Sequence, residues 1–174
     1  MSSSPKALEP RALAQALAQQ ARSIRELLTG RSPESMRWKA SPSTWSLLEC
    51  LHHLLDEERR DFRLRIQKLL ADEPWPGIDP EAWVLEQAYN QQDPARILEE
   101  FQAERAASIQ WIQALEALDL ERTRDHPQLG TLSVGDLLAA WLAHDLLHLG
   151  QLTRLCLALH KQECAPFRSD YAGG

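Results

Sequence analysis

The chain has 174 residues, of which 44% are hydrophobic and 25% are charged, a balance typical of a globular protein with one sizeable core. This composition excludes a disordered chain and a small disulfide-stapled scaffold. The formal charge is −6, from 19 lysines and arginines against 25 aspartates and glutamates, without a cluster of cations for phosphate groups. We therefore expect no nucleic-acid partner.

The longest apolar run, residues 137–143, is far shorter than the roughly 20 residues that span a bilayer, so we expect no transmembrane helix. The first ten residues lack the apolar core of a secretion signal. The three cysteines have no framework spacing for disulfides. These features together predict a cytoplasmic protein with free thiols.

Apolar residues recur at three- and four-residue intervals through several long windows, which predicts an all-α chain. The first helix is expected to start at Pro10, to carry Leu13 and Leu17 on its apolar face, and to end at Gly30. Residues 31–44, rich in proline, serine and threonine, are predicted to connect it to the next helix.

A capping box begins the second helix, because Ser46 can cap the third amide of the helix while Glu49 reaches back to the Ser46 amide. This helix is expected to run to about Leu70. The link over residues 72–92 contains an Asp-Pro pair that predicts a short helix over residues 79–89. Since helix connections usually have about 2–8 residues, a link this long can travel back along a bundle and leave the second and third helices parallel.

A further Asp-Pro pair at residues 93–94 predicts the start of a third long helix, which is expected to end near Leu118. Ser133 is the expected cap of a fourth helix that runs to about His160. Four helices of this length predict a four-helix bundle, with residues 1–174 forming a single domain.

Two histidines lie four residues apart within the fourth helix, in the segment HDLLHLGQL (residues 144–152). The helical period places His144 and His148 on one face, with Gln151 beside them, so both imidazoles can reach one ion. A histidine pair leaves zinc with an incomplete ligand set. The alternative is a pair of buried neutral histidines that form hydrogen bonds between helices.

A second source of histidine is the pair His52-His53 near the start of the second helix, and a metal site between bundle helices is a known use of this architecture. The helical wheel leaves both histidines at the flanks of the apolar stripe and does not choose between them. His53 shares a face with Cys50 and Glu57, so a thiol or a carboxylate could complete a site or orient a ligand. For Glu57, a solvated charge is the commoner outcome.

Asp145 falls near the middle of the apolar stripe of the fourth helix, where an unpaired carboxylate costs several kcal/mol. We expect a partner for it, either an arginine or histidine of another helix or the second nitrogen of a ligand histidine. A kinked or frayed surface helix is the alternative.

Other residues have no partner pattern that indicates chemistry. We expect His126, in a loop, and His160, at a helix end, to be solvated, Cys156 to lie in the core and Cys164 at the surface. The chain has no glycine-rich phosphate loop, no Gly-x-Ser-x-Gly elbow and no Cys-x-x-Cys pair, which argues against nucleotide, serine-hydrolase and zinc-finger functions.

The segments WSLLECLHHLLDE (residues 45–57) and HDLLHLGQL (residues 144–152) resemble the DinB/YfiT-like metal-binding four-helix bundles. Residues 78–83 of the link and 166–174 of the tail are also similar to this family. The resemblance covers most of the chain from Trp45 onward. The family includes bacillithiol and related thiol S-transferases and proteins described as metal-dependent hydrolases.

The resemblance implies that His53, His144 and His148 bind a divalent metal, with zinc or nickel as the expected ion. It also implies an up-down-down-up bundle, a small-molecule substrate such as a low-molecular-weight thiol, and a homodimer. Three neutral histidines leave positions where a thiol or water can bind and become a nucleophile at neutral pH. The family's range of reactions does not define the reaction of this chain.

Three hypotheses therefore stand at the level of the sequence. The first is a metal-dependent enzyme with thiol S-transferase or hydrolase activity, although no glutamate has the general-base position of a His-Glu-x-x-His helix. The second is a metal-binding stress-response protein whose ion serves folding or sensing. The third is a metal-free helical binding module with a histidine cluster.

Overall fold

The computed structural model of the protein describes residues 6–75, 77–115 and 118–172. The long helical segments are α1 (Pro10–Leu28), the successive helices α3 (Leu47–Arg60) and α4 (Phe62–Leu70), α6 (Pro94–Gln113) and α7 (Val134–Glu163). The connections contain α2 (Pro33–Arg37), α5 (Pro80–Glu86), the 3-10 turns η1 (Lys6–Leu8), η2 (Tyr89–Gln91) and η3 (Asp170–Ala172), and a hairpin of β1 (Thr123–His126) and β2 (Gly130–Ser133).

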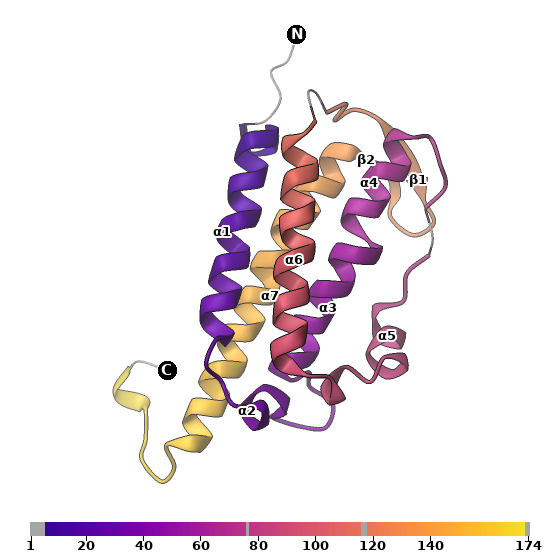
Figure 1. The fold of residues 1–174 in the computed structure, drawn as a ribbon. Helices are drawn as coiled ribbons and strands as arrows, with labels where there is room; N and C mark the ends of the chain where they lie inside the picture. Colours follow the sequence, from indigo (N-terminus) through magenta and orange to yellow (C-terminus); the bar gives the residue numbers. More distant parts are fainter. Residues whose placement is uncertain (1–5, 76, 116–117, 173–174) are drawn as a thin grey trace.

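The long segments form a four-helix bundle with the predicted direction of each helix. Figure 1 shows that α1 and α7 run one way and that α3–α4 and α6 run the other, so the second and third segments are parallel. The link that contains α5 returns along the bundle between them. Helices α1 and α3 both pack against α6 and α7, which gives the order α1, α6, α3, α7 around the bundle. The all-α fold class predicted from the sequence is confirmed.

Local side chains determine where the helices begin. The Ser46 hydroxyl accepts the Glu49 amide at 3.1 Å and the Glu49 carboxylate accepts the Ser46 amide at 2.7 Å, as the capping-box pattern predicts. Ser133 and Asp136 form the same box at the start of α7. Because α3 and α7 carry the candidate site, these caps fix the first turn of both helices that present it.

The second helix departs from the prediction, because it is not one helix to Leu70 but two. Asp61 leaves helical geometry, with φ −121° and ψ −99°, and separates α3 from α4. The chain direction continues across the break, since the Asp61 amide bonds the Glu57 carbonyl and the Arg65 amide bonds the Asp61 carbonyl. No glycine or proline marks this position, so the pattern of the sequence does not reveal it.

Three predicted helix ends are also corrected. Helix α5 ends at Glu86 rather than Tyr89, because Ala88 adopts a left-handed conformation with φ +47°. Helix α6 ends at Gln113, and Leu118 instead packs on the core from non-helical backbone. Helix α7 continues past His160 to Glu163, where the approach to Pro166 stops it. Residues 1–5 of the N-terminal segment, 116–117 near the expected end of the third helix and 173–174 of the tail lie outside the described residues.

Two short elements were not predicted. Helix α2 lies in the expected connection, where Ser32 accepts the Ser35 amide at 3.2 Å and Pro33 follows it. The hairpin pairs Thr123 with Ser133 and ends in a turn in which Gly130 has φ +74°. Strands of four residues are too short for apolar alternation to stand out in a sequence.

The bundle interior consists of two apolar clusters with a buried charged layer between them. This layer contains Glu58, near the end of α3, Arg105 on α6 and Asp145 on α7, each placed along the chain between members of the two clusters. Each is 1% exposed. Of the helices that the structure describes, none has the length and apolar composition needed to cross a membrane.

Candidate metal centre

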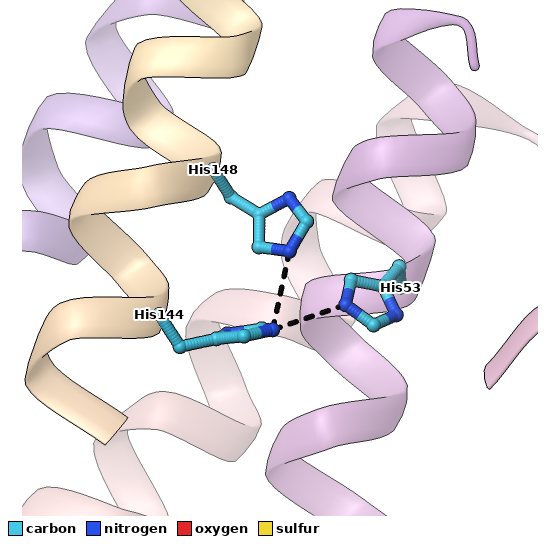
Figure 2. Close-up of side chains that lie close together, drawn as sticks. All are labelled: His53, His144 and His148. Atoms are coloured by element: carbon cyan, nitrogen blue, oxygen red, sulfur yellow. Dashed lines mark hydrogen bonds between the residues drawn. The ribbon is translucent and has the colours of Figure 1, made fainter. Parts of the chain in front are cut away.

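Helices α3 and α7 bring three histidines together. Figure 2 shows His53 projecting from one helix and His144 and His148 projecting from the other toward it. His144 and His148 are one turn apart, so the α-helical period places both rings on the same face of α7. Trp45, directly before α3, lies against this group, with its ring 5.0 Å from the His53 ring and stacked 6.3 Å from the His148 ring.

The imidazole nitrogens converge on one point. The Nε2 atom of His144 lies 3.1 Å from Nε2 of His53 and 3.1 Å from Nε2 of His148. Two nitrogens that each bind one zinc ion at about 2.0–2.1 Å lie about 2.8–3.4 Å apart for angles between about 90° and 110°. The spacing of the three nitrogens therefore fits a shared divalent ion.

The outer nitrogen of His148 is held in place. Nδ1 of His148 lies 2.8 Å from Oε1 of Gln151, which can only accept, so Nδ1 carries the proton and Nε2 presents its lone pair. Nδ1 of His53 lies 3.7 Å from Oε1 of Glu57. Nδ1 of His144 is buried and has no hydrogen-bond partner among the described residues. Gln151 thus orients a ring whose inner nitrogen is available to a metal.

Burial keeps the three rings neutral. Desolvation, followed by the neighbouring histidines, lowers the pKa of His53 to about 3, and desolvation followed by His148 and Arg105 lowers the pKa of His144 to about 3. Burial also lowers the pKa of His148. Neutral imidazoles are the form that binds a metal ion, so the donors are ready at neutral pH.

These shifts predict a pH dependence of stability in the metal-free protein. A lowered histidine pKa means that the unfolded chain, which titrates near 6.5, binds more protons than the folded chain below that pH, so the free energy of unfolding falls as pH falls. Each buried histidine contributes up to about 1.4 kcal/mol per pH unit in this window. Urea unfolding at pH 7.5, 6.5 and 5.5 with a chelator measures the slope.

The matched comparison for this prediction is His144→Gln beside His160→Gln. Glu57 opposes the histidine effect, because burial and Asp61 raise its pKa to about 9, but it is common to all the proteins compared and cancels in the differences. We expect a shallower decline in His144→Gln and an unchanged one in His160→Gln, since His160 is exposed. Equal slopes for all three proteins contradict the prediction.

The structure separates the two neighbouring histidines of α3. His53 joins the cluster, whereas the His52 ring stacks on Tyr89 at 3.9 Å. The Tyr89 hydroxyl and the Gln87 amide both donate to Oδ2 of Asp56, which is 1% exposed. His52 therefore helps to hold the link between α4 and α6 against α3.

Cys50 and Glu57, which share a face with His53, do not join the nitrogens. Among the described residues, the group of potential metal ligands whose donor atoms all lie within 4.8 Å of one another contains the three histidines alone. Cys50 is fully buried in an apolar cluster. Glu57 lies on the Nδ1 side of His53, so its contact is with the back of the ring.

The position of Cys50 predicts its reactivity. Burial, with Glu49 nearby, raises the pKa of its thiol to about 12, and the thiolate is the reactive form. Titration of the native protein with Ellman's reagent at pH 8 is expected to detect two or fewer of the three cysteines, and urea is expected to expose the third. The Cys50→Ala variant should match the native count of the wild type, and a lower native count in this variant would contradict the assignment.

The predicted partner of Asp145 is an arginine from another helix. Nη2 of Arg105 donates to Oδ1 of Asp145 at 3.0 Å while Nη1 donates to Oδ2, and Nε donates to Oε1 of Glu58 at 2.9 Å. The Trp141 indole and the Ser108 hydroxyl also donate to Glu58. The sequence pattern did not indicate Arg105 or Glu58. It indicated only that the carboxylate of Asp145, in the apolar stripe of α7, needs a partner.

The remaining sequence predictions are confirmed only in part. His160 is exposed, as predicted. His126 does not lie in a loop, because it ends strand β1, where it is half-buried and its Nδ1 accepts the amides of Gln128 and Leu129 at 3.2 Å. Cys156 and Cys164 are both partly exposed.

The arrangement defines a helical bundle with a three-histidine group between its second and fourth long segments. The chain matches the DinB superfamily over residues 16–152. It therefore belongs to the DinB superfamily.

Individual relatives agree with this assignment. A protein of Oceanobacillus iheyensis, whose name proposes a metal-dependent hydrolase, is 29% identical over 116 residues, which cover 64% of this chain and about 65% of that protein. YfiT from Bacillus subtilis, described as a probable metal-dependent hydrolase with an unusual four-helix bundle topology, matches with a TM-score of 0.75 and 18% identity over 89% of each chain.

A third similar structure is the colibactin self-resistance protein ClbS, in complex with double-stranded DNA. It matches with a TM-score of 0.59 and 14% identity over 93% of this chain and 99% of that one. At such identities the two structural matches establish the fold of the chain.

Proposed function

We propose that His53, His144 and His148 bind one divalent metal ion and that the protein is a metal-dependent enzyme acting on a small molecule. The observation that carries this proposal is the convergence of three Nε2 atoms, with 3.1 Å between His144 and each of the other two. Imidazole nitrogens at this spacing suit zinc or nickel as a shared ion. The name of the Oceanobacillus iheyensis relative and the description of YfiT support the same activity class.

The side chains around the histidines prepare the site for chemistry. A bound divalent ion would supply a positive charge that lowers the pKa of a thiol or a water molecule and makes it a nucleophile. Gln151 holds the His148 ring, and the Phe62 and His144 rings form an edge-to-face pair with centres 5.3 Å apart, so the site has an apolar wall on the α4 side. Trp45 covers the two rings of His53 and His148.

Thiol transfer and hydrolysis make different demands on this site. In thiol transfer the thiol loses its proton to solvent, its sulfur forms a bond to an electrophilic carbon, and the leaving group departs with the electron pair of the broken bond. Hydrolysis profits from a general base beside the attacking water. Since no carboxylate joins the three nitrogens among the described residues, we favour transfer of a low-molecular-weight thiol, with hydrolysis as the second reaction to test.

A non-catalytic metal-binding protein of stress response is the alternative function. The observation that favours it is the burial of His53, which is 4% exposed and links α3 to α7 through the cluster. An ion held there would connect two helices and stabilise the bundle without chemistry. A cytoplasmic location and a homodimer stay predictions under both functions.

Activity assays on tag-free protein separate the two functions. The protein is stripped with a chelator, reloaded with zinc or nickel, and assayed for conjugation of thiols to monobromobimane and for hydrolysis of p-nitrophenyl esters. We expect at least one metal-dependent reaction, abolished in His53→Gln and preserved in His52→Gln. Metal binding without any reaction would favour the non-catalytic function, and an equal rate in His53→Gln would contradict the site.

A further inference from the structure

A cavity of about 920 Å³ lies beside the histidine group and is not part of it. Its walls come from the start of α4, the link after α4, the hairpin and the first turns of α7, which lie together in Figure 1. The larger apolar residues of its lining include Phe62, Trp75, Ile78, Leu129, Leu132 and Leu137. This volume and lining are typical of a pocket for a small molecule.

The cavity and the histidine group share a wall. Phe62 lines the cavity, and its ring forms an edge-to-face pair with the His144 ring, with centres 5.3 Å apart. Ala140, also in the lining, lies one helical turn before His144 on α7. A molecule seated in the cavity can therefore lie against Phe62, the residue whose ring contacts His144.

The hairpin turns Arg124 and His126 toward the cavity. Residues of β1 alternate between exposed and half-buried, so Arg124 and His126 face inward, whereas Asp125 is an exposed residue at the edge of the same cavity lining. Asp125 pairs across the hairpin with Thr131, whose hydroxyl donates to its carboxylate at 2.7 Å. Leu132, opposite Arg124 in the register, completes the inward face.

Arg124 and His126 each have a hydrogen-bond donor available to a ligand. Nη2 of Arg124 bonds the highly exposed Asp72 at 3.0 Å, while its Nε is buried without a hydrogen-bond partner among the described residues. Because Nδ1 of His126 accepts two backbone amides, its Nε2 carries the proton and can donate.

The two other carboxylates in the lining are committed to neighbours. Asp61 forms an ion pair with Arg65, whose guanidinium also lies over the Trp75 ring at 5.4 Å. Asp136 accepts the amide and the hydroxyl of Ser133 in the capping box of α7. The cavity thus combines a large apolar lining with available donors at its hairpin end and acceptors that are already occupied.

We infer that this cavity binds a small amphipathic organic anion, with its anionic group at Arg124 and His126 and its apolar body along Phe62 toward the histidines. The inference rests on the proposed function for the reacting end of the molecule, because the histidine group is the place where that end would react. It assigns to Arg124 the recognition of the substrate's negative charge, since a hydrogen bond from a charged donor in a partly buried site is strong.

Two fluorescent probes test the anion site in chelator-treated protein. The probes are 8-anilinonaphthalene-1-sulfonate and its uncharged counterpart N-phenyl-1-naphthylamine, which lacks the sulfonate. We expect Arg124→Gln to weaken sulfonate binding about tenfold and to leave the uncharged probe within twofold. Arg122→Gln is the matched control, because Arg122 also approaches Asp72, at 4.0 Å, but does not line the cavity.

The result that overturns the anion site is equal sulfonate affinity in Arg124→Gln and the wild type, or an equal loss in Arg122→Gln. Ala140→Trp, which places an indole into the cavity from α7, is expected to weaken both probes at least tenfold. Unchanged binding in this variant would place the probes elsewhere and overturn the assignment to the cavity. Thermal unfolding of each variant confirms that it is folded.

Metal-loaded protein tests the connection to the histidines. Cobalt(II), whose visible absorption overlaps the emission of the bound sulfonate probe, is expected to quench that emission by at least half relative to zinc. Absence of quenching at one cobalt per chain overturns the connection between cavity and histidines. If the chain binds no metal, the proposed function fails, and the measurements on metal-free protein still decide whether the cavity binds anions.

Discussion

The Arg105→Met variant is expected to lower the free energy of unfolding by about 3–5 kcal/mol, because it leaves two buried carboxylates without their cation. Arg105, Glu58 and Asp145 are each 1% exposed, and the guanidinium bonds both carboxylates. One of its nitrogens also donates to the carbonyl of Leu17 on α1 at 3.3 Å. The arginine thereby joins all four long segments at the middle of the bundle.

The charged layer also bears on the candidate site. Asp145 directly follows His144 on α7 and precedes His148 by three residues. The rotation of α7 that brings Asp145 to Arg105 therefore also turns both histidines toward His53. We therefore expect Arg105→Met to weaken metal binding as well as stability. Urea unfolding measures the first effect, and titration with a chromophoric zinc competitor measures the second.

Arg63→Met is the control for the charged layer. Arg63 lies on α4 and pairs with Glu104 of α6, but the side chain of Glu104 is 26% exposed, so the loss of Arg63 is expected to cost about 1 kcal/mol or less. A triple variant with Arg105→Met, Glu58→Gln and Asp145→Asn should recover part of the stability, since no buried charge is left unpaired. Equal losses in Arg105→Met and Arg63→Met would contradict the role given to the layer.

Removal of the metal is expected to lower the melting temperature by about 10 °C. A ligand present at about a thousand times its dissociation constant stabilises the folded state by about 4 kcal/mol, and 1 kcal/mol corresponds to about 2–4 °C in a chain of this length. The three histidines come from α3 and α7, so the ion would connect helices that must separate on unfolding. Differential scanning calorimetry with and without added zinc measures the shift.

The matched comparison is between His144→Gln and His52→Gln. His144 is the nitrogen donor that lies 3.1 Å from both others, so its loss is expected to abolish the zinc-dependent shift. His52 stacks on Tyr89 outside the cluster, so its variant is expected to keep the shift even where its basal melting temperature is lower. A zinc-dependent shift of the same size in His144→Gln would exclude the cluster as the binding site.

The features of the fold that were predictable from the sequence are those that local chemistry determines. The Ser46 and Ser133 caps, the start of α6 after Asp93 and the parallel direction implied by the long link were all present in residue types and spacing. The break at Asp61 was not, because no glycine or proline marks its position in the sequence. Four-residue strands such as β1 give too little alternation to be distinguished from a loop.

The candidate site was also predictable only in part from the sequence. The helical period placed His144 and His148 on one face, and the resemblance to the family selected His53, which the wheel alone could not separate from His52. The need of Asp145 for a partner followed from its place in the apolar stripe. The identity of that partner, Arg105, depends on how two helices far apart in the sequence meet, and no local pattern carries that information.

The most direct test of the proposed metal centre is elemental analysis of tag-free protein purified beside its His148→Ala variant, with zinc and nickel offered to both. The proposal predicts about one divalent ion per chain in the wild type and a loss of most of it in the variant, since His148 supplies one of three converging nitrogens. Metal absent from both proteins, or retained equally in both, would contradict a metal centre formed by His53, His144 and His148.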